Sequence, residues 1–518
     1  MQNRLLKNSI LSLVTIILFC SAANAVRISD DTENNSLNDD YDPDVNIVVT
    51  VEIQKIRSLE YKNYQHWAFE VIDLLSKPDF YVKVFINGQE YKSTVWKNTR
   101  YINDPEWSAT CDVPDDVEFV NISIQLWDKN FGFDRMCDIS SNDGLFRDNY
   151  DIELTYSIKT GHWWGDDYVE LEPTGRDPSG YGRLNGCDDG SIYERDRDCE
   201  LWFDIYQNDY DGDGIPYWTE VNVFDTDPHV DDTGRDDDGD NVPIEWEYKW
   251  GHMVYYDWQS QTYYHDWFWN PFEYNDHANL DPDNDGLSNY EEYLTSQWGS
   301  DPFRKDVFVE LDQMETSPDG QESVLSAEAI ELLNTAFDVH NIVFHLDDGS
   351  MGGSDIIPFD DETPQDELQD IYWNYFLRGD ENNWRRGVFH YGIVVYDATF
   401  SGFVFWGGVG PYLDSFQISS SWVEKNVLPK TKHRRDLAYA SVYMHELGHT
   451  FGFNPIGGHD LDSYYPWQIN WWKWGPYKSC MNYRYTYRLV DYSDGSRGRN
   501  DFDDWTRMDL TYFQRPLF

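Results

Sequence analysis

Two histidines spaced four residues apart constrain the C-terminal part of this chain more than any other feature. His445 and His449 flank Glu446 in the run HELGH. On a helix, residues four positions apart lie on the same face, so both imidazoles can bind one metal ion. The glutamate between them points into the same cleft, where it can deprotonate a metal-bound water. The pattern therefore predicts a zinc-binding helix with a general base.

The surrounding residues favour this interpretation over a surface helix with two solvated histidines. Apolar residues recur at helical spacing upstream of the motif, and Gly452 stands where the chain must turn to bring in a third ligand. A separate turn, SCMNY, follows at residues 479–483. We expect a strand at 306–311, a helix at 326–334, strands near 342–346 and 392–396, and a closing helix at 505–513.

HExxHxxG followed by an S-x-M-N-Y turn resembles the metzincin clan of zinc endopeptidases. The resemblance covers residues 305–518 and implies an α/β peptidase domain that acts on a protein or peptide substrate. It implies that Met481 lies beneath the metal site and that Tyr483 approaches it. Tyr483 would then donate a hydrogen bond to the oxyanion, while Glu446 would carry the proton from water to the leaving amine. The alternative for Tyr483 is a packed aromatic residue.

The sequence departs from the clan at the third ligand. The clan's spacing places that ligand at Pro455, which cannot bind zinc. The run FNPIGGHD is interpreted as the same turn lengthened by a few residues. His459 is then the expected third ligand and Asp460 the alternative, since imidazole and carboxylate both bind zinc.

The N-terminus has the features of a secretory signal peptide. A basic start, an apolar run over residues 10–19 and the small-residue sequence ANA ending at Ala25 predict a signal over 1–25, and hence a secreted protein. Residues 26–44 are polar and acidic and are predicted to form a flexible arm. No later segment is apolar enough to predict a membrane span.

The 518-residue chain is long enough for three or more domains and carries a net charge of −56. Such a surface repels nucleic acid, which excludes nucleic-acid binding as a function. Much of the excess charge is aspartate in clustered D-x-D runs. This clustering favours cation binding, with a salt-adapted surface as the alternative. Nothing in the sequence predicts an oligomeric state.

Cysteine spacing is compatible with disulfides in an oxidising compartment. After removal of the signal, Cys111 with Cys137 and Cys187 with Cys199 are the local pairs that the spacing suggests. Cys480, beside Met481, is left over and is expected to be a buried free thiol.

Three β-rich runs, at residues 47–53, 80–86 and 122–127, predict an antiparallel β-sandwich over residues 45–158. Residues 159–206 are rich in Gly, Asp and Trp and are predicted to form a connector that contains a disulfide and closes with a strand at 201–206.

The blocks DFYVKV, KNT with NDPEW, and LWDKN in the sandwich resemble the C2 domain, which binds calcium and often lipid through its tip loops. The resemblance implies four calcium-binding positions, namely Asp73, Asp79, Asp128 and Asn130. Asn130 stands where an aspartate is usual, so the site would be weaker by one charge. A sandwich kept only for its core is the alternative. Lipid contact stays open, because Phe131 and Phe133 lie in a tip loop but basic residues are few.

An internal repeat over residues 207–304 matches the calcium-loop template D-x-D-x-D-G-x5-E. The three copies carry these predicted ligands: Asp209, Asp211, Asp213 and Glu220; Asp236, Asp238, Asp240 and Glu247; Asp281, Asp283, Asp285 and Glu292. Asn241 replaces the glycine of the second copy and tolerates the same left-handed turn. The loops resemble the single-loop calcium repeats of secreted proteins, such as thrombospondin type-three and dockerin segments. Pro216 and Pro243 argue against the flanking helices that paired EF-hands require.

The expected molecule is therefore multidomain: an N-terminal antiparallel β-sandwich, central calcium-binding loop repeats, and a C-terminal α/β metzincin-like peptidase domain. The expected activity is that of a secreted zinc metalloendopeptidase with Ca²⁺ as a structural cofactor. The alternative is a calcium-dependent extracellular binding or adhesion protein that carries an inactive peptidase fold. The presence of Glu446 favours the enzyme, since a site that only binds metal has no need of that carboxylate.

Overall fold

The computed structural model describes residues 41–59, 72, 77–140, 143–144, 147–148, 150–166, 182–186, 197–257, 259–398, 400–404, 414–453 and 457–514. The predicted signal peptide, residues 26–40 of the predicted arm, Asp73, Cys187 and Pro455 lie outside these residues. The chain divides into two compact units, Met1–Asn275 and Asp276–Phe518. This boundary falls inside the predicted repeat domain 207–304, so the first two acidic loops belong to one unit and the third loop to the other.

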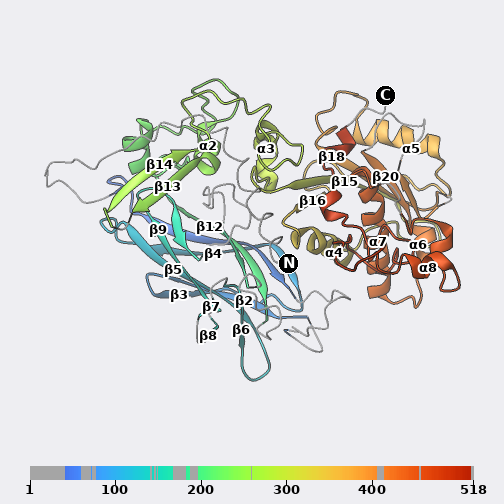
Figure 1. Cartoon of the computed structure of the whole chain (residues 1–518). Helices are drawn as coiled ribbons and strands as arrows, with labels where there is room; N and C mark the ends of the chain where they lie inside the picture. Colours follow the sequence, from blue (N-terminus) through green and yellow to red (C-terminus); the bar gives the residue numbers. More distant parts are fainter. Residues whose placement is uncertain are drawn as a thin grey trace, which may run out of the picture. The chain divides into compact units, whose positions relative to one another are not determined.

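A β-sandwich of two antiparallel sheets forms most of the first unit (Figure 1). One sheet has the order β11-β12-β1-β4, and the other has the order β10-β9-β5-β2-β3 with β6 beside β5. The strands are β1 (Val48–Ser58), β2 (Phe80–Ile86), β3 (Gln89–Lys92), β4 (Tyr101–Asp112), β5 (Phe119–Asp128), β6 (Arg135–Cys137), β9 (Ile152–Ser157), β10 (Trp163–Gly165), β11 (Gly182–Asn185) and β12 (Cys199–Gln207), with a small separate pair β7 (Asp143–Gly144) and β8 (Arg147–Asp148). The prediction of an N-terminal antiparallel sandwich is confirmed.

Period-two burial explains why these runs form a sandwich. In β5 every second residue is buried, including Val120, Ile122 and Ile124. They share one core with Val49 and Val51 of β1, which lies in the opposite sheet. Each sheet thus covers the apolar face of the other.

The predicted connector is part of the sandwich. β12 pairs antiparallel with β1 from Ser58↔Cys199 to Val49↔Gln207, and β10 pairs with β9. Leu201 and Phe203 of β12 are fully buried in the sandwich core. The sandwich therefore extends well past the predicted end at residue 158. The second neighbour of β1 is β12, a strand that follows about 140 residues later in the chain.

The predicted Cys111–Cys137 disulfide is wrong, since both cysteines are buried free thiols. Cys111 lies in β4 within hydrogen-bonding reach of Gln89, whereas Cys137 pairs with Leu126 in the other sheet. Sequence proximity does not bring the two thiols together, because the strands that carry them belong to opposite sheets. The second predicted pair involves Cys187, outside the described residues.

A short helix follows each acidic loop, contrary to the expectation from the prolines. The helices are α1 (Tyr217–Thr219), continued by a π-helical turn at Glu220–Phe224, α2 (Ile244–Gly251) and α3 (Asn289–Thr295), which continues as a 3-10 turn at Ser296–Trp298. Pro216 and Pro243 each occupy the N-cap, where no intrahelical N–H is required, so they start helices here and do not prevent them. A hairpin of β13 (His252–Asp257) and β14 (Thr262–Trp267) follows α2.

A mainly parallel sheet with the order β16-β15-β18-β20-β19 forms the centre of the second unit, with β17 beside β15 (Figure 1). Only β19, the strand at one end, runs antiparallel to its neighbour. The elements are β15 (Asp306–Met314), α4 (Ala327–Asp338), β16 (Val343–Asp347), β17 (Ile356–Ile357), α5 (Gln365–Ile371) with a π-helical turn at Tyr372–Phe376, β18 (Phe389–Val395), β19 (Gly402–Val404), β20 (Ser415–Ser419), α6 (Ser420–Asn426), α7 (Lys432–Thr450), a 3-10 turn at Leu461–Ser463, α8 (Ile469–Lys473), and 3-10 turns at Trp505–Arg507 and Tyr512–Gln514. The predicted closing helix at 505–513 is wrong: only the last two short turns form there.

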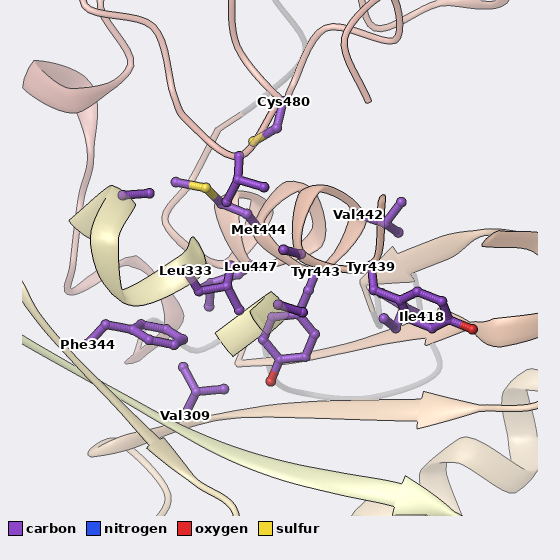
Figure 2. Packing of buried hydrophobic residues seen from close by; sticks show 14 of the residues in the cluster. Val309, Leu333, Phe344, Ile418, Tyr439, Val442, Tyr443, Met444, Leu447 and Cys480 are labelled. Carbon is purple, nitrogen blue, oxygen red and sulfur yellow. The ribbon is translucent and has the colours of Figure 1, made fainter. Parts of the chain in front are cut away.

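The sheet has an apolar core on each face. Val307 and Val309 of β15 pack with α4 and α7 on one face, while Phe308 packs with α5 on the other. Figure 2 shows the first core, in which Tyr443 and Leu447 of α7 lie among residues of β15, α4 and β16. Packing against the sheet and α4 therefore fixes the position of α7, the helix that carries the HELGH motif. No helix in the described ranges is long and apolar enough to cross a membrane.

Candidate metal centres

Helix α7 positions the two histidines of the HELGH motif. Thr431 caps its N-terminus by accepting a hydrogen bond from the Arg434 backbone N–H at 3.4 Å. Gly452, with φ of 80°, lies just past its end in the left-handed conformation that a sharp exit requires. From Asp436 to Thr450 nearly every residue is buried, so His445 and His449 face the protein interior.

His459 joins these two histidines to form a triad. One ring nitrogen of each lies within 4.8 Å of the others, and the Nε2 atoms of His445 and His459 are 3.1 Å apart. Asp460, the alternative third ligand, uses both carboxylate oxygens elsewhere: Ser463 donates to one at 3.0 Å and Asn470 to the other at 3.1 Å. His459 is thus the third member of the triad, whereas the Asp460 carboxylate accepts hydrogen bonds from residues that follow it in the chain.

Backbone carbonyls fix the tautomers of the two helical histidines. His445 Nδ1–H donates to the Cys480 carbonyl at 2.7 Å, and His449 Nδ1–H donates to the Phe453 carbonyl at 2.8 Å. Burial lowers the pKa of all three imidazoles, to about 4 for His449 and His459, so they are neutral at pH 7. The Nε2 atoms of His445 and His449 therefore present lone pairs to the centre of the triad, as metal ligation requires.

Glu446 lies beside the triad, 4.0 Å from His445 Nε2. Its side chain is almost fully buried, and desolvation raises its pKa to about 8. Gly402 of β19 makes room for it, because a Cβ atom at that position would lie 2.5 Å from Glu446 Oε1. No local pattern in the sequence marks Gly402 for this role, because Glu446 lies far from it along the chain.

The SCMNY turn packs against the same helix from the other side. Met481 is 3% exposed, and its Sδ atom would lie 2.7 Å from a Cβ at Gly448. Cys480 is a buried free thiol, as predicted. The Tyr483 backbone N–H donates to the Gly458 carbonyl at 2.9 Å, and its ring centroid is 4.3 Å from that of His459. The turn therefore holds the loop of the third histidine as well as His445.

A row of aromatic rings leads from the triad to the surface. Tyr464 lies 5.1 Å from Tyr483, and Tyr465 lies 6.0 Å from Tyr464 and 4.5 Å from Trp467, measured between ring centroids. Trp467 is 78% exposed. Exposed Leu461, Ile469 and Trp472 extend this apolar surface. The region beside the histidines is thus much more apolar than the acidic composition of the chain suggests.

The three acidic loops share one hydrogen-bond pattern. The first aspartate of each loop accepts from the backbone N–H groups three and five residues later, and the third aspartate accepts from the N–H two residues later. The bonds run from Gly212 and Gly214 to Asp209, from Gly239 and Asn241 to Asp236, from Asn284 and Gly286 to Asp281, and from Ile215, Val242 and Leu287 to Asp213, Asp240 and Asp285. Asn241 adopts φ of 76°, so it takes the left-handed turn expected of it. The loops are preformed around converging carboxylates.

The predicted twelfth-position glutamates are buried beside their loops. Burial, reinforced by neighbouring aspartates, raises the pKa of Glu220 to about 8 and that of Glu247 to about 9. The same causes raise the pKa of Glu292 well above its usual range. So many buried carboxylates repel one another unless a cation neutralises them.

A downstream residue, not predicted from the sequence, closes each loop. The third aspartate accepts a further backbone hydrogen bond from Asp232, Asn275 or Asp306 in the first, second and third loops, respectively. The carboxylate of Asp232 also lies within 4.8 Å of those of Asp213 and Glu220. Their signal in the sequence is faint, since the closing residue lies at a different distance from each loop.

The predicted calcium positions of the sandwich come together only in part. Asp128 Oδ1 accepts from the Asp79 N–H at 3.0 Å, and the Asn130 side chain donates to Asp128 Oδ2. Asp134, a further acidic residue of the same loop, accepts from the Tyr81 hydroxyl at 2.9 Å and from Lys129 at 3.0 Å. Asp73 lies outside the described residues. Phe131 and Phe133 of the same loop are fully exposed.

Residues 48–143 match the C2 domain family. Comparison with curated proteins gives no match. Similar solved structures include human GIVD cytosolic phospholipase A2 in complex with methyl gamma-linolenyl fluorophosphonate, at 16% identity over 31% of this chain and a TM-score of 0.17; this chain covers 17% of that one. They also include a pair of C2 domains from Extended-Synaptotagmin 2, at 12% identity over 35% of this chain and 47% of that chain, with a TM-score of 0.18. A C2 domain protein from Ramazzottius varieornatus is 12% identical over 31% of this chain and 88% of that chain, with a TM-score of 0.16.

Proposed function

We propose that this chain, whose residues 48–143 form a C2 domain, is an exported zinc-dependent endopeptidase with calcium-stabilised acidic loops. The observation that carries the proposal is the convergence of His445, His449 and His459 next to the buried carboxylate of Glu446. Export rests on the signal-like segment at residues 1–25.

The donor set of the triad fits zinc. His445 and His449 each commit their Nδ1–H group to a carbonyl, so their Nε2 atoms offer lone pairs, and a ring nitrogen of His459 lies within reach of both. Such nitrogens are preferred zinc ligands, and three of them leave a fourth position open. A zinc ion bound there would lower the pKa of water and polarise a peptide carbonyl.

The residues around the triad supply the acid–base chemistry. A carboxylate whose pKa lies near neutrality can take a proton from water and return it to a leaving amine, and Glu446 is such a group. Burial raises the pKa of Tyr483 to about 12, so its phenol keeps its proton at pH 7 and can donate to a developing oxyanion.

The expected substrate is an extended polypeptide with apolar side chains. β19 lies at the end of the sheet beside Glu446, where a peptide can add as a further strand. The aromatic row from Tyr483 to Trp467 offers apolar contacts to its side chains.

Cleavage of an unfolded protein by the calcium-loaded chain, together with its zinc content, tests the proposal. Wild type is expected to bind about one zinc per triad and to cleave. Glu446→Gln should keep the zinc and lose about 10²–10⁴-fold in kcat, because only the proton transfer is removed. His449→Ala should lose both zinc and cleavage. Zinc binding without cleavage in the wild type would instead support the inactive, calcium-dependent binding protein.

Contact with lipid is a second candidate function, favoured by Phe131 and Phe133 at the tip of the C2 domain. Two fully exposed phenylalanines in one loop can insert into a bilayer interface. Co-sedimentation with phosphatidylcholine vesicles in calcium should fall when both are replaced by alanine. Equal sedimentation of Phe131→Ala/Phe133→Ala and wild type would exclude insertion through this loop.

A further inference from the structure

The third acidic loop differs from the other two in its position in the fold. It belongs to the same compact unit as the histidine triad, whereas the first two loops belong to the other unit. Its closing residue, Asp306, is also the first residue of β15. β15 pairs with β16, β17 and β18, so more of the sheet depends on it than on any other strand.

Asp306 is attached to the loop and to the sheet at once. Its backbone N–H donates to Asp285 Oδ2 at 2.7 Å, and its Oδ2 accepts from the Asp301 N–H at 2.9 Å. Its Oδ1 contacts Nε2 of His345 on β16. Asp301 and Asp306 are both buried, and their charges act on Asp283 and Glu292, so they belong to the same electrostatic cluster as the loop.

Two buried carboxylate oxygens in this cluster make no hydrogen bond to the described part of the chain. Glu292 is only 2% exposed, and its Oε2 atom makes no hydrogen bond within the described residues. Asp283 Oδ2 is likewise buried without a hydrogen bond there. The charges of the closing residues thus act on the loop carboxylates, and two oxygens of these carboxylates are directed at no protein donor in the described part of the chain. That is the arrangement that a hard cation satisfies.

We propose that Asp301 and Asp306 belong to the third cation site, and that Ca²⁺ bound there fastens β15 and so sets the stability of the α/β unit that carries the histidine triad. This inference rests on the proposed calcium binding of the loops but not on peptidase activity. Val307 and Val309, which follow Asp306 on β15, pack in the same core as Tyr443 and Leu447 of α7. Calcium at the third loop therefore supports α7, although it lies far from the histidines in sequence.

Calcium titration of the full-length protein tests the composition of the site. Glu220→Gln and Glu247→Gln together weaken the first two loops and leave the third as the main site. In that background, Asp306→Asn and Asp301→Asn should each weaken the remaining calcium site at least about tenfold, since each removes one charge from the ligand cluster. Asp348→Asn changes an exposed aspartate of the same unit and serves as the control. An affinity within about twofold of the background for both variants would overturn the assignment.

Hydrogen exchange of the unmodified protein tests the coupling and needs no variant that might fail to fold. Removing calcium should increase exchange at least about tenfold in peptides covering β15 and α7. The Glu220→Gln/Glu247→Gln protein in saturating calcium should keep wild-type protection in both peptides. Unchanged protection of β15 after chelation would overturn the coupling. Neither measurement uses cleavage, so loss of the peptidase proposal alone would leave these results unaffected.

Discussion

Tyr483 is the residue whose role the sequence left most open, between an oxyanion donor and a packed aromatic. Its ring stands 4.3 Å from that of His459, and burial keeps its phenol protonated at pH 7. Tyr483→Phe should keep zinc and KM and lower kcat about 10²-fold, because the hydrogen bond forms only in the transition state. Steady-state kinetics with Tyr465→Phe as control checks this. An unchanged kcat would assign Tyr483 to packing.

Asn241 is a second residue with a specific conformational role. Its φ of 76° is left-handed, a conformation that asparagine and glycine adopt more readily than other residues. Asn241→Ala should lower the free energy of unfolding by about 1 kcal/mol in calcium, whereas Asn241→Gly should stay close to wild type. Urea unfolding of the two variants measures the difference. Equal losses for both would show that the asparagine side chain matters, and not the backbone angle.

At the scale of elements, α7 and the SCMNY turn are fitted to each other at Gly448. A Cβ there would lie 2.7 Å from Met481 Sδ, 2.9 Å from the Phe453 ring and 3.0 Å from the Tyr492 ring. Gly448→Ala should therefore cost about 1–3 kcal/mol of stability and weaken zinc binding, since the turn also supplies the carbonyl that orients His445. Thermal unfolding and zinc competition, with exposed His433→Ala on the same helix as control, check both effects. A stable Gly448→Ala protein with normal zinc affinity would mean that the turn can move away freely.

The acidic loops show how the same element can be used in different contexts. Each loop forms the same internal hydrogen bonds and leads into a short helix, yet each closes on a different partner. The prolines that were expected to exclude helices begin two of them, because the first turn of a helix leaves its N–H groups unpaired in any case.

At the scale of the whole molecule, the net charge of −56 makes stability depend on pH and calcium together. Without a cation, Glu220 and Glu247 have a pKa of about 8 and about 9 in the folded chain, against 4.5 in the unfolded chain. Between pH 4.5 and about 9 the folded state thus binds more protons than the unfolded state. The stabilisation from these two groups is therefore complete below pH 4.5 and is lost as the pH rises toward 9. In excess chelator the melting temperature of the first unit should fall by about 5 °C or more between pH 5 and pH 9.

Calcium should remove this slope, because bound carboxylates no longer take up protons on folding. Scanning calorimetry with and without chelator at several pH values measures it. Glu220→Gln/Glu247→Gln, which lacks both groups, should flatten the slope in chelator. A melting temperature in chelator that does not change with pH would contradict the proposed energetics.

Local patterns identified many elements but not where domains end. Period-two and helical spacing identified β2, β5 and the core of α7, because each signal lies within one element. Three other predictions differ from the structure because they depended on which strands lie side by side. They are the end of the sandwich at residue 158, the single repeat domain and the Cys111–Cys137 pair. The helix expected at 505–513 formed only short turns, since propensity without a long packed face does not sustain a helix.

Local sequence patterns predict the candidate ligands: the spacing of His445 and His449, the D-x-D loops and the C2 blocks each lie within a short run, and such spacing indicates which donors share a face. Three features are visible only in the folded chain: His459 and not Asp460 lies with the two helical histidines, Gly402 makes room for Glu446, and Asp306 joins the third loop to the central strand. Those features depend on contacts between residues far apart in the chain. Such contacts follow from how the elements pack, which no short run of residues encodes.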